Sequence, residues 1–362
     1  MQTKHTLFIT GAAGYVGAML CDQFSKRDDV EQIVGLDKEP CPELIAKNPK
    51  VMFIQYDMSE AGWEEKVRAY KPDVVVHTAW QIRELYGDRA LEWKWNVDGS
   101  DRVFNFAFDE PSVRVLVHFS TVSSYGAFAD NTVDHFFTED EPFRKSEYLY
   151  AEEKRVCEEH LHDMFEAARA KGKHVPQVFI LRPAAITGPR GRFARIRFGL
   201  QSALSGALKG QGSKFYDLIS FMVSWVPVTP KWLRQYVHED DVADIVALFS
   251  FATPAGSYEI VNLAPPGACV FGPDMARAVG KRPITVQPWM VRIPFFLLWH
   301  LSRGHVPTAR GSWRGYSYPI AVDGSKLTKK FGFNYRCSSY DAFYYTNGRY
   351  EGDVPETLQR HK

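Results

Sequence analysis

Residues 7–17 read Leu-Phe-Ile-Thr-Gly-Ala-Ala-Gly-Tyr-Val-Gly, which joins an apolar run to a glycine-rich segment. The apolar run at 7–10 predicts a buried strand, and the apolar periodicity of 15–26 predicts a helix directly after the glycines. Glycine lets a backbone approach a pyrophosphate closely because it has no Cβ, and the first turn of a helix offers unpaired N–H groups to that anion. A tight strand-to-helix turn without a ligand is the alternative interpretation. The strand before and the helix after the glycines favour a dinucleotide site.

Short apolar runs continue to alternate with segments of helical length as far as residue 182. This alternation predicts βαβ units and a parallel sheet covered by helices on both faces. The predicted fold class is therefore α/β, with a Rossmann-type doubly wound parallel sheet. The strands are expected at residues 7–10, 32–37, 51–57, 73–78, 114–120 and 177–182, and the helices at 15–26, 61–70, 91–108 and 150–171.

The regular alternation ends after residue 182, where proline, glycine and aromatic residues become frequent. Residues 236–251 and 258–263 then read as a helix and a strand that return to the main sheet. The chain is therefore expected to carry a second, smaller lobe built from two excursions. The predicted division is 1–183 with 236–263 for the Rossmann domain, 184–235 with 264–340 for a discontinuous C-terminal substrate-binding lobe, and 351–362 for a mobile tail.

The composition is that of an ordinary globular protein. Its 362 residues include 44 Lys and Arg against 43 Asp and Glu, and a net charge of only +1 gives no reason to expect a nucleic-acid partner. The most apolar late run, 293–301, is about half of the ~20 residues that a membrane span needs, and no signal peptide is recognisable. We expect a soluble, cytoplasmic protein with no nucleic-acid partner, no membrane span and no bound metal. Five scattered cysteines are typical of reduced thiols: Cys21, Cys41, Cys157, Cys269 and Cys337.

Asp37 ends the second predicted strand, 20 residues beyond Gly17. A carboxylate at this place accepts hydrogen bonds from an adenosine ribose and repels a 2′-phosphate, which favours NAD over NADP. Because Lys38 lies directly beside Asp37, NADP remains the alternative cofactor. Asp57 ends the third predicted strand, where it can reach an adenine edge or serve as a turn residue.

Tyr150 and Lys154 stand four residues apart in a predicted helix and therefore share one of its faces. A tyrosine is a poor base at neutral pH, but a nearby ammonium lowers the pKa of a phenol toward the working range. The pair alone is weak evidence, because any helix can carry these two residues at that spacing. Hydroxyl side chains at Ser120 and Thr121 follow the fifth predicted strand, and the carboxyl ends of parallel strands line the ligand crevice of this fold.

Together these features resemble the extended short-chain dehydrogenase/reductases, the NAD-dependent epimerase/dehydratase family, over about residues 5–335. The resemblance implies NAD as cofactor, a small-molecule substrate and hydride transfer at a secondary alcohol. The matching motifs are Thr10-Gly11-x-x-Gly14-x-x-Gly17, Asp37, Asn96-Val97-x-Gly99, Ser120-Thr121-x-x-x-Tyr125-Gly126, Tyr150-x-x-x-Lys154, Arg234-x-Tyr236-Val237-His238-x-x-Asp241-Val242-Ala243, and Asp323-x-Ser325-Lys326 with Phe331-Gly332-Phe333.

The resemblance also implies roles for single residues. The implied catalytic residues are Thr121, Tyr150 and Lys154. The implied cofactor-binding residues are Gly11, Ala13, Gly14, Tyr15, Val16, Gly17, Asp37, Asp57, Met58, Thr78, Ala79, Asn96, Tyr150, Lys154 and Pro183. The implied substrate-binding residues are Thr121, Ser123, Ala185 and Arg234.

Departures from the family pattern bear on the substrate. Val122 and Ser123 replace the Asp-Glu pair of sugar-nucleotide 4,6-dehydratases, so dehydration is disfavoured. Ala185 replaces an Asn that holds a nucleotide diphosphate in many epimerases, whereas Arg234 occupies the place of a phosphate-binding arginine or is a solvated rim residue. We expect 4-epimerase-like chemistry on a sugar nucleotide, with hydride abstracted and returned. The alternatives are a hydroxysteroid-like or other lipophilic alcohol dehydrogenase, and a non-catalytic NAD-binding protein.

Three further features bear on packing and assembly. His77 and His118 lie in apolar strand runs and are expected to be core histidines. The aromatic-basic run 289–303 can be a helix of the substrate lobe, a partner face or a membrane-surface helix, and packing within the lobe is the expectation. The resemblance implies a homodimer through the helices at 91–108 and 150–171. The apolar residues of that interface would include Trp95, Val103, Phe104, Phe106, Val156, Leu161 and Phe165.

Overall fold

The computed structural model describes residues 4–195, 224–252, 257–267 and 269–362. The chain forms two compact units. Unit 1 consists of Met1–Thr121, Glu152–Arg182 and Ala243–Val261, and unit 2 of Val122–Ala151, Pro183–Val242 and Asn262–Lys362.

Two segments that we expected in the Rossmann domain belong to unit 2, namely 122–151 and 236–242. The first contains β6 (Phe136–Phe137), which pairs in parallel with β15 (Ala321–Val322). The second begins with a strand where we expected a helix, because residues 236–238 pair with residues 185–187. Strand pairing with distant parts of the chain therefore decides the boundary.

Unit 1 is built on a seven-stranded sheet of order β12-β7-β5-β4-β1-β2-β3. Neighbouring strands from β7 to β3 pair in parallel. The chain leaves β1 for β2 and β3 on one side and continues with β4 and β5 on the other, so the switch point lies between β1 and β4. The predicted doubly wound α/β fold is confirmed. The strands are β1 (His5–Thr10), β2 (Val30–Asp37), β3 (Val51–Gln55), β4 (Val74–His77), β5 (Val115–Phe119), β7 (Gln177–Pro183) and β12 (Tyr258–Leu263).

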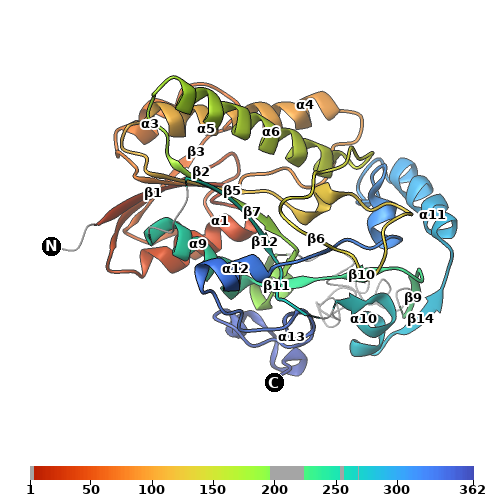
Figure 1. The fold of residues 1–362 in the computed structure, drawn as a ribbon. Helices are drawn as coiled ribbons and strands as arrows, with labels where there is room; N and C mark the ends of the chain where they lie inside the picture. Colours follow the sequence, from red (N-terminus) through yellow and green to blue (C-terminus); the bar gives the residue numbers. More distant parts are fainter. Residues whose placement is uncertain (1–3, 196–223, 253–256, 268) are drawn as a thin grey trace. The chain divides into compact units, whose positions relative to one another are not determined.

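Helices cover both faces of this sheet, with α3, α5 and α6 on one face and α1 and α9 on the other (Figure 1). On the first face the Phe8 ring lies 5.3 Å from the Trp63 ring and 5.6 Å from the Phe106 ring, measured between centroids. On the second face the Phe179 ring stacks on Phe249 at 4.5 Å. The helices are α1 (Tyr15–Ser25), α2 (Glu43–Ala46), α3 (Trp63–Arg68), α4 (Arg89–Trp93), α5 (Gly99–Asp109), α6 (Leu149–Ala170) and α9 (Glu239–Phe251).

The helix expected at 91–108 consists of three consecutive elements. α4 is followed by a π-helical turn, Lys94–Asp98, and then by α5. Asn96 in the middle of this turn is fully buried, and its side chain bonds to Gln81 and Glu153 rather than to solvent. A π turn of this kind often accompanies a functional site, because it re-aims one side chain of a helix.

The described residues of unit 2 form four two-stranded sheets and several helices. The pairs are β10 with β13, β11 with β8, β14 with β9 and β15 with β6. The strands not yet located are β8 (Ala185–Thr187), β9 (Trp225–Val228), β10 (Leu233–Arg234), β11 (Tyr236–His238), β13 (Val270–Phe271) and β14 (Arg282–Thr285), and the helices are α10 (Gly272–Ala278), α11 (Pro288–Leu301), α12 (Ser325–Phe331) and α13 (Ser339–Tyr344).

The C-terminal segment, which we expected to be mobile, is held within unit 2. Val354 is buried, and the Thr346 backbone nitrogen donates to the Arg360 carbonyl oxygen at 2.9 Å. Lys362 Nζ lies 2.7 Å from Asp341 Oδ2. An apolar anchor and a terminal ion pair therefore fix residues that looked like a charged tail.

No helix in the described ranges is long and apolar enough to cross a membrane. Those ranges also contain no cluster of three or more His, Cys, Asp or Glu side chains that could hold a metal ion.

The homodimer remains a prediction, and the structure weakens the apolar argument for it. Val103, Phe104, Phe106, Leu161 and Phe165 are all buried inside unit 1. These side chains need no partner subunit, because they pack against the sheet of their own chain. We still predict a dimer from the family resemblance, to be tested by light scattering at micromolar concentration. A monomeric mass under those conditions contradicts it.

Candidate active site

The glycine-rich turn between β1 and α1 is shaped by close contacts of its own backbone. Gly11 has φ +73°, and a Cβ at this position would lie 2.6 Å from the Ala79 backbone nitrogen. Added Cβ atoms on Gly14 and Gly17 would come within 2.9 and 2.1 Å of the Gly11 carbonyl oxygen. A Cβ does not fit at these distances, so the turn itself requires all three glycines.

The N-terminus of α1 suits an anion. The helix begins at Tyr15, which is followed by Val16, and its first turn contains no acidic residue. Its N-cap residue, Gly14, has no side chain that could cap the helix. Beside the turn, Thr78 Oγ1 donates to the Thr10 carbonyl oxygen at 2.7 Å. This arrangement fits a pyrophosphate, as the sequence predicts.

Asp37 lies where a ribose carboxylate is expected. Its Oδ2 accepts a hydrogen bond of 2.9 Å from the backbone nitrogen of Ala13, which joins the end of β2 to the glycine turn. Burial raises the pKa of Asp37, and the backbone N–H bonds from Glu39 and Ala13 oppose that rise. The neighbouring Lys38 ammonium lies 3.1 Å from the centroid of the Trp95 ring, so it is engaged by an aromatic face.

We predict that NAD stabilises the protein more than NADP at equal concentration. The 2′-phosphate would face the Asp37 carboxylate, and even a tenfold weaker affinity corresponds to about 1.4 kcal/mol. Thermal melts with each cofactor measure the difference between the two increases in melting temperature. Asp37→Ala should narrow it, whereas Asp109→Ala, an exposed substitution at the end of α5, should leave it unchanged. A shift with NADP that equals or exceeds the shift with NAD contradicts the prediction.

Asp57 closes a turn, which is one of its two predicted roles. Its Oδ1 accepts from the backbone nitrogen and from Oγ of Ser59, at 2.9 and 2.8 Å. The next residue, Met58, is buried against Gly99, where a Cβ would lie 3.0 Å from Met58 Cε. Contact of either residue with an adenine stays a prediction.

Lys154 of α6 is fixed at the carboxyl end of β5. Its ammonium donates to the Phe119 carbonyl oxygen and lies 3.4 Å from the centroid of the Trp80 ring. Burial lowers the pKa of Lys154 to about 7, and the nearby acidic groups only partly offset this effect. Because Phe119 directly precedes Ser120 and Thr121, the ammonium is held next to the predicted hydroxyls of that strand end.

A buried carboxylate that the sequence analysis missed supports the same region. Glu153 is fully buried, and its Oε2 accepts a hydrogen bond of 2.7 Å from Asn96 Nδ2. Burial, together with the charges of Glu92 and Glu84, raises the pKa of Glu153 to about 8. Burial also raises the pKa of Glu92 to about 7. A Glu directly before Lys154 was visible in the sequence, but its partner Asn96 is 57 residues away along the chain.

We predict that Glu153→Gln stabilises the protein at alkaline pH. The Glu153 pKa is about 8 in the folded protein and near the ordinary glutamate value of 4.5 when the chain is unfolded, so the folded state binds an extra proton between these two pH values. The stability of the natural chain therefore falls as pH rises through this window, and the substitution removes that loss. The difference in unfolding free energy should grow from near zero at about pH 5 to on the order of 2–4 kcal/mol at about pH 8.5.

Urea unfolding at both pH values measures this difference. Glu166→Gln, on the exposed side of the same helix, is the control and should show no such growth. The prediction is contradicted if the difference in unfolding free energy between Glu153→Gln and the natural chain stays constant with pH.

Two stacked histidines lie in the adjoining strands. The His77 and His118 rings have centroids 5.2 Å apart. His77 Nδ1 lies 2.6 Å from Thr10 Oγ1 and its Nε2 lies 2.8 Å from Ser100 Oγ, as befits a core histidine. Neither ring nitrogen of His118 has a hydrogen-bond partner in the described part of the chain. Burial, with a smaller effect from the charge of Lys154, holds the pKa of both rings well below the usual range.

The remaining predicted catalytic residues are Thr121 and Tyr150, and the predicted substrate residue Ser123 follows Thr121 in the chain. Thr121 is buried at the end of β5, and Ser123 lies in the 3-10 turn Val122–Tyr125. Tyr150 is half-buried in the first turn of α6, four residues before Lys154. Within unit 2, Ser124 Oγ donates to the Ala151 carbonyl oxygen at 2.9 Å, which ties the turn of Ser123 to the turn of Tyr150.

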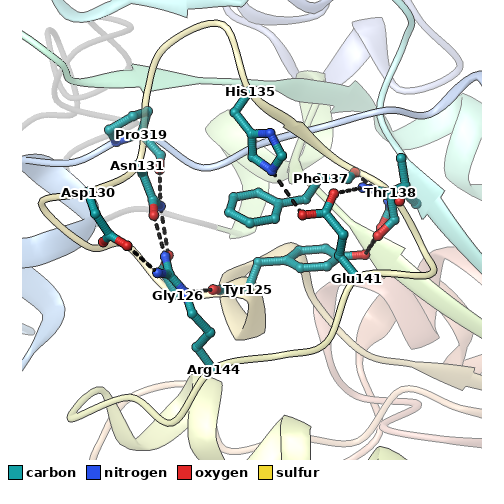
Figure 2. Close-up of polar contacts among 11 residues, drawn as sticks. Tyr125, Gly126, Asp130, Asn131, His135, Phe137, Thr138, Glu141, Arg144 and Pro319 are labelled. Carbon is teal, nitrogen blue, oxygen red and sulfur yellow. Dashed lines mark hydrogen bonds and ion pairs between the residues drawn. The ribbon is translucent and has the colours of Figure 1, made fainter.

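Tyr125, part of the Tyr-Gly motif, anchors the segment between the 3-10 turn and α6. Figure 2 shows its hydroxyl directed at the Thr138 carbonyl oxygen, 2.9 Å away. Nearby, Asn131 Nδ2 donates to the carbonyl oxygens of Gly126 and Pro319, at 2.9 and 2.7 Å. The motif residue is therefore structural, because it positions the turn that carries Ser123.

Pro183, which was predicted to bind the cofactor, is buried at the end of β7. Of the predicted substrate residues, Ala185 lies in β8 and Arg234 in β10, and the Ala185 backbone nitrogen donates to the carbonyl oxygen of Gln235 at 3.2 Å. Arg234, next to Gln235, is partly exposed, and its guanidinium carbon lies 5.0 Å from the centroid of the Tyr316 ring. No carboxylate in the described ranges forms an ion pair with Arg234.

A curated relative matches part of the chain. The decarboxylating sterol-4-alpha-carboxylate 3-dehydrogenase of Candida albicans is 26% identical over 200 residues, which is 53% of this chain and 53% of that protein. The chain therefore spans about half the length of the curated relative that it matches.

Solved structures share the fold over nearly the whole chain. The Bordetella bronchiseptica enzyme WbmG, in complex with NAD and UDP, is 20% identical, with coverage of 94% of this chain and 92% of that one and a TM-score of 0.69. The UDP-glucose 4-epimerase of Thermotoga maritima, with UDP-glucose, is 18% identical, with coverage of 94% and 97% and a TM-score of 0.68. Identities this low establish the fold alone.

The model of the NAD dependent epimerase/dehydratase family matches residues 7–264, well over half of the chain. That match covers the glycine turn, Asp37 and the pair on α6. Family membership confirms NAD as the cofactor expected from the sequence. The chain belongs to the NAD dependent epimerase/dehydratase family.

Proposed function

We propose that this chain uses NAD to remove a hydride from a secondary alcohol, with Tyr150, Lys154 and Thr121 as its catalytic residues. One observation carries the proposal. The buried ammonium of Lys154 is fixed at the carboxyl end of β5, one helical turn from Tyr150. Bound NAD supplies the hydride acceptor.

Each of the three side chains has a distinct task. Tyr150 takes the proton of the substrate hydroxyl on its phenolic oxygen, while the carbon gives up its hydride. The positive charge of Lys154 stabilises the resulting phenolate. Thr121 orients the reacting oxygen through a hydrogen bond. The glycine turn and Asp37 hold the pyrophosphate and the adenosine ribose.

A sugar nucleotide is the substrate class that we favour, with the hydride returned to the opposite face of the transient ketone. Arg234 supports this choice, since it forms no ion pair with any carboxylate among the residues that the structure describes and can pair with a phosphate. WbmG was solved with UDP and the Thermotoga epimerase with UDP-glucose, which agrees with this choice.

A lipophilic alcohol is the second candidate, and a different residue favours it. Ala185 offers a methyl group where a diphosphate-binding epimerase offers an amide, so one polar contact to a nucleotide is missing. The similarity to a sterol-4-alpha-carboxylate 3-dehydrogenase points the same way. Such a substrate would be oxidised once, and NADH would be released as a product.

The two candidates are separated by assaying the purified chain with NAD. UDP-hexoses are followed by chromatography of the sugar product, and 3β-hydroxysterols by nicotinamide absorbance. For a sugar nucleotide, Arg234→Ala should raise KM by roughly 10- to 100-fold with kcat nearly unchanged, because it removes a charged hydrogen bond to phosphate. Arg277→Ala, on the exposed surface of α10, is the control. Turnover of sterols alone overturns the sugar-nucleotide proposal, and NAD binding without any turnover supports a non-catalytic protein.

A reducing compartment such as the cytoplasm suits the cysteines. All five are free thiols. Cys21 and Cys157 are fully buried, and burial raises the pKa of both thiols, which keeps them protonated and unreactive. We propose cytoplasmic localisation on this basis, to be tested by imaging the tagged protein in its own cells.

A further inference from the structure

Helix α11 presents apolar side chains outward along its whole length. It spans Pro288–Leu301, and only Val291 and Trp299 are buried among its 14 residues. Leu301 is the most exposed large apolar residue of the described chain, with 81% of its surface accessible. The exposed apolar residues of the helix are Trp289, Met290, Ile293, Phe296, Leu297, Leu298 and Leu301, each between 43 and 81% exposed.

The inward stripe of the helix is narrow. Val291, Phe295 and Trp299 recur every four residues and form it, and the Phe295 ring lies 5.2 Å from the Tyr316 ring. The opposite side is apolar as well, and the helix carries only two ionisable residues, Arg292 and His300. A helix with so little polar surface is normally covered on more than one side, so we expect the outward face of α11 to be covered as well. The packing within the lobe that we expected for this run accounts only for the inward stripe.

The segment of the sequence that contains α11 carries basic but no acidic residues. Residues 275–322 contain no Asp or Glu, although the whole chain carries 43 of them. Glu147, from outside this stretch, pairs with Arg310 at 3.3 Å and with Arg314 at 3.8 Å. The seven basic residues of the stretch are Arg277, Lys281, Arg282, Arg292, Arg303, Arg310 and Arg314. The net charge of the whole chain is near zero and gave no reason to expect an anionic membrane partner. It does not reveal that acidic residues are absent from this one segment.

The strand β14 precedes α11 in the chain (Figure 1), and it also carries an exposed apolar residue. Ile284 of β14 is 43% exposed, and Trp225 of the paired strand β9 is 53% exposed. In the register of the two strands Arg282 lies opposite Trp225, and its guanidinium carbon is 5.4 Å from the centroid of that ring. Tryptophan beside arginine is typical of a surface that meets the headgroup region of a membrane.

We propose that α11 lies in the surface layer of a lipid bilayer with anionic headgroups. Its apolar face would enter the boundary of the acyl chains, while Arg292 and Arg303 pair with the headgroups. The helix is too short to cross, since 14 residues at 1.5 Å each give about 21 Å against a hydrocarbon core of about 30 Å. Pro294 has no N–H for the Met290 carbonyl, and that carbonyl keeps access to water only at the surface of the bilayer.

A second copy of the chain is the less suitable occupant of this face. A two-fold contact through α11 would bring Arg292 and Arg303 of both copies together, with no acidic residue in 275–322 to compensate them. Anionic lipid supplies the missing negative charge. The proposal does not depend on which alcohol the chain oxidises.

Co-sedimentation with vesicles tests the proposal. We expect the full chain, with NAD bound, to bind phosphatidylcholine vesicles containing phosphatidylserine at least roughly tenfold more tightly than vesicles of phosphatidylcholine alone, and salt to weaken the binding. Phe296→Gln with Leu301→Gln should weaken binding to both kinds of vesicle. Met52→Gln, an exposed apolar residue of β3, is the control and should bind as the natural chain does.

A charge variant separates the two contributions. Arg292→Gln with Arg303→Gln should remove most of the preference for anionic lipid, whereas Lys329→Gln with Lys330→Gln on α12 should keep it. Quenching of tryptophan fluorescence by brominated acyl chains reports how deeply the helix enters the bilayer. Trp289→Phe should abolish most of this quenching.

Absence of vesicle binding overturns the proposal. So does a result in which Phe296→Gln with Leu301→Gln converts a dimer to a monomer in light scattering and leaves vesicle binding unchanged, because a second copy then covers the helix.

Discussion

Tyr150→Phe lowers kcat by about 10²- to 10⁴-fold and leaves the affinity for NAD nearly unchanged. The substitution removes only the phenolic oxygen that would take the proton of the substrate hydroxyl. The ring stays in the first turn of α6, and the ammonium of Lys154 keeps its bond to the Phe119 carbonyl. The result is read from steady-state kinetics on the substrate found above, with NAD affinity measured by calorimetry.

The neighbouring tyrosine gives a matched control for this experiment. Tyr148 lies just before α6, with its ring centroid 5.7 Å from that of Tyr150, and Tyr148→Phe should retain most of the activity. Lys154→Ala should lower both kcat and NAD affinity, because we propose that the ammonium also holds the nicotinamide ribose. Full activity of Tyr150→Phe would remove the tyrosine from the mechanism and favour a protein that binds NAD without turnover.

Gly17→Ala is expected to have the second large effect, on cofactor binding. Its Cβ would lie 2.1 Å from the Gly11 carbonyl oxygen, so the turn must open before the methyl group fits. Forcing extra atoms into a packed site costs about 1–3 kcal/mol, which corresponds to roughly 5- to 150-fold in affinity if the change falls on the bound turn. Calorimetry measures the Kd for NAD, and a thermal melt without cofactor measures the part of the cost that falls on folding.

Gly352→Ala is the control for this substitution, because a Cβ there meets no atom within 4 Å. Loss of stability without loss of NAD affinity would show that the glycine serves the fold only. An unchanged protein on both measurements would contradict the contacts observed in the turn.

The nucleotide-binding half could be predicted from the sequence because its determinants are local. The turn at Gly11–Gly17 depends on residues that lack a Cβ within seven consecutive positions, and Tyr150 and Lys154 share a face through helical spacing alone. The strands of unit 1 appear as short apolar runs because both faces of a parallel sheet are buried. Their observed limits lie within a few residues of those expected.

The partners of the catalytic lysine could not be predicted, because they come from distant parts of the chain. Trp80 and Phe119 reach Lys154 only after three separate segments have packed. The bond between Glu153 and Asn96 depends in addition on a π turn that no local pattern indicated. The residue type alone does not show that a carboxylate is buried in such a site, because its burial depends on the residues packed around it.

The sequence by itself determined the fold class, the cofactor and the spacing of the catalytic pair, since each depends on steric and helical rules that act over a few residues. Tertiary structure alone decided that residues 122–151 belong to unit 2, because β6 finds its partner β15 about 185 residues later. It alone decided that Phe104, Leu161 and Phe165 are buried in the core and that the outward side chains of α11 are exposed in the described part of the chain. Periodicity shows which residues of a helix are apolar, but which of them lose contact with water depends on the elements packed against that helix.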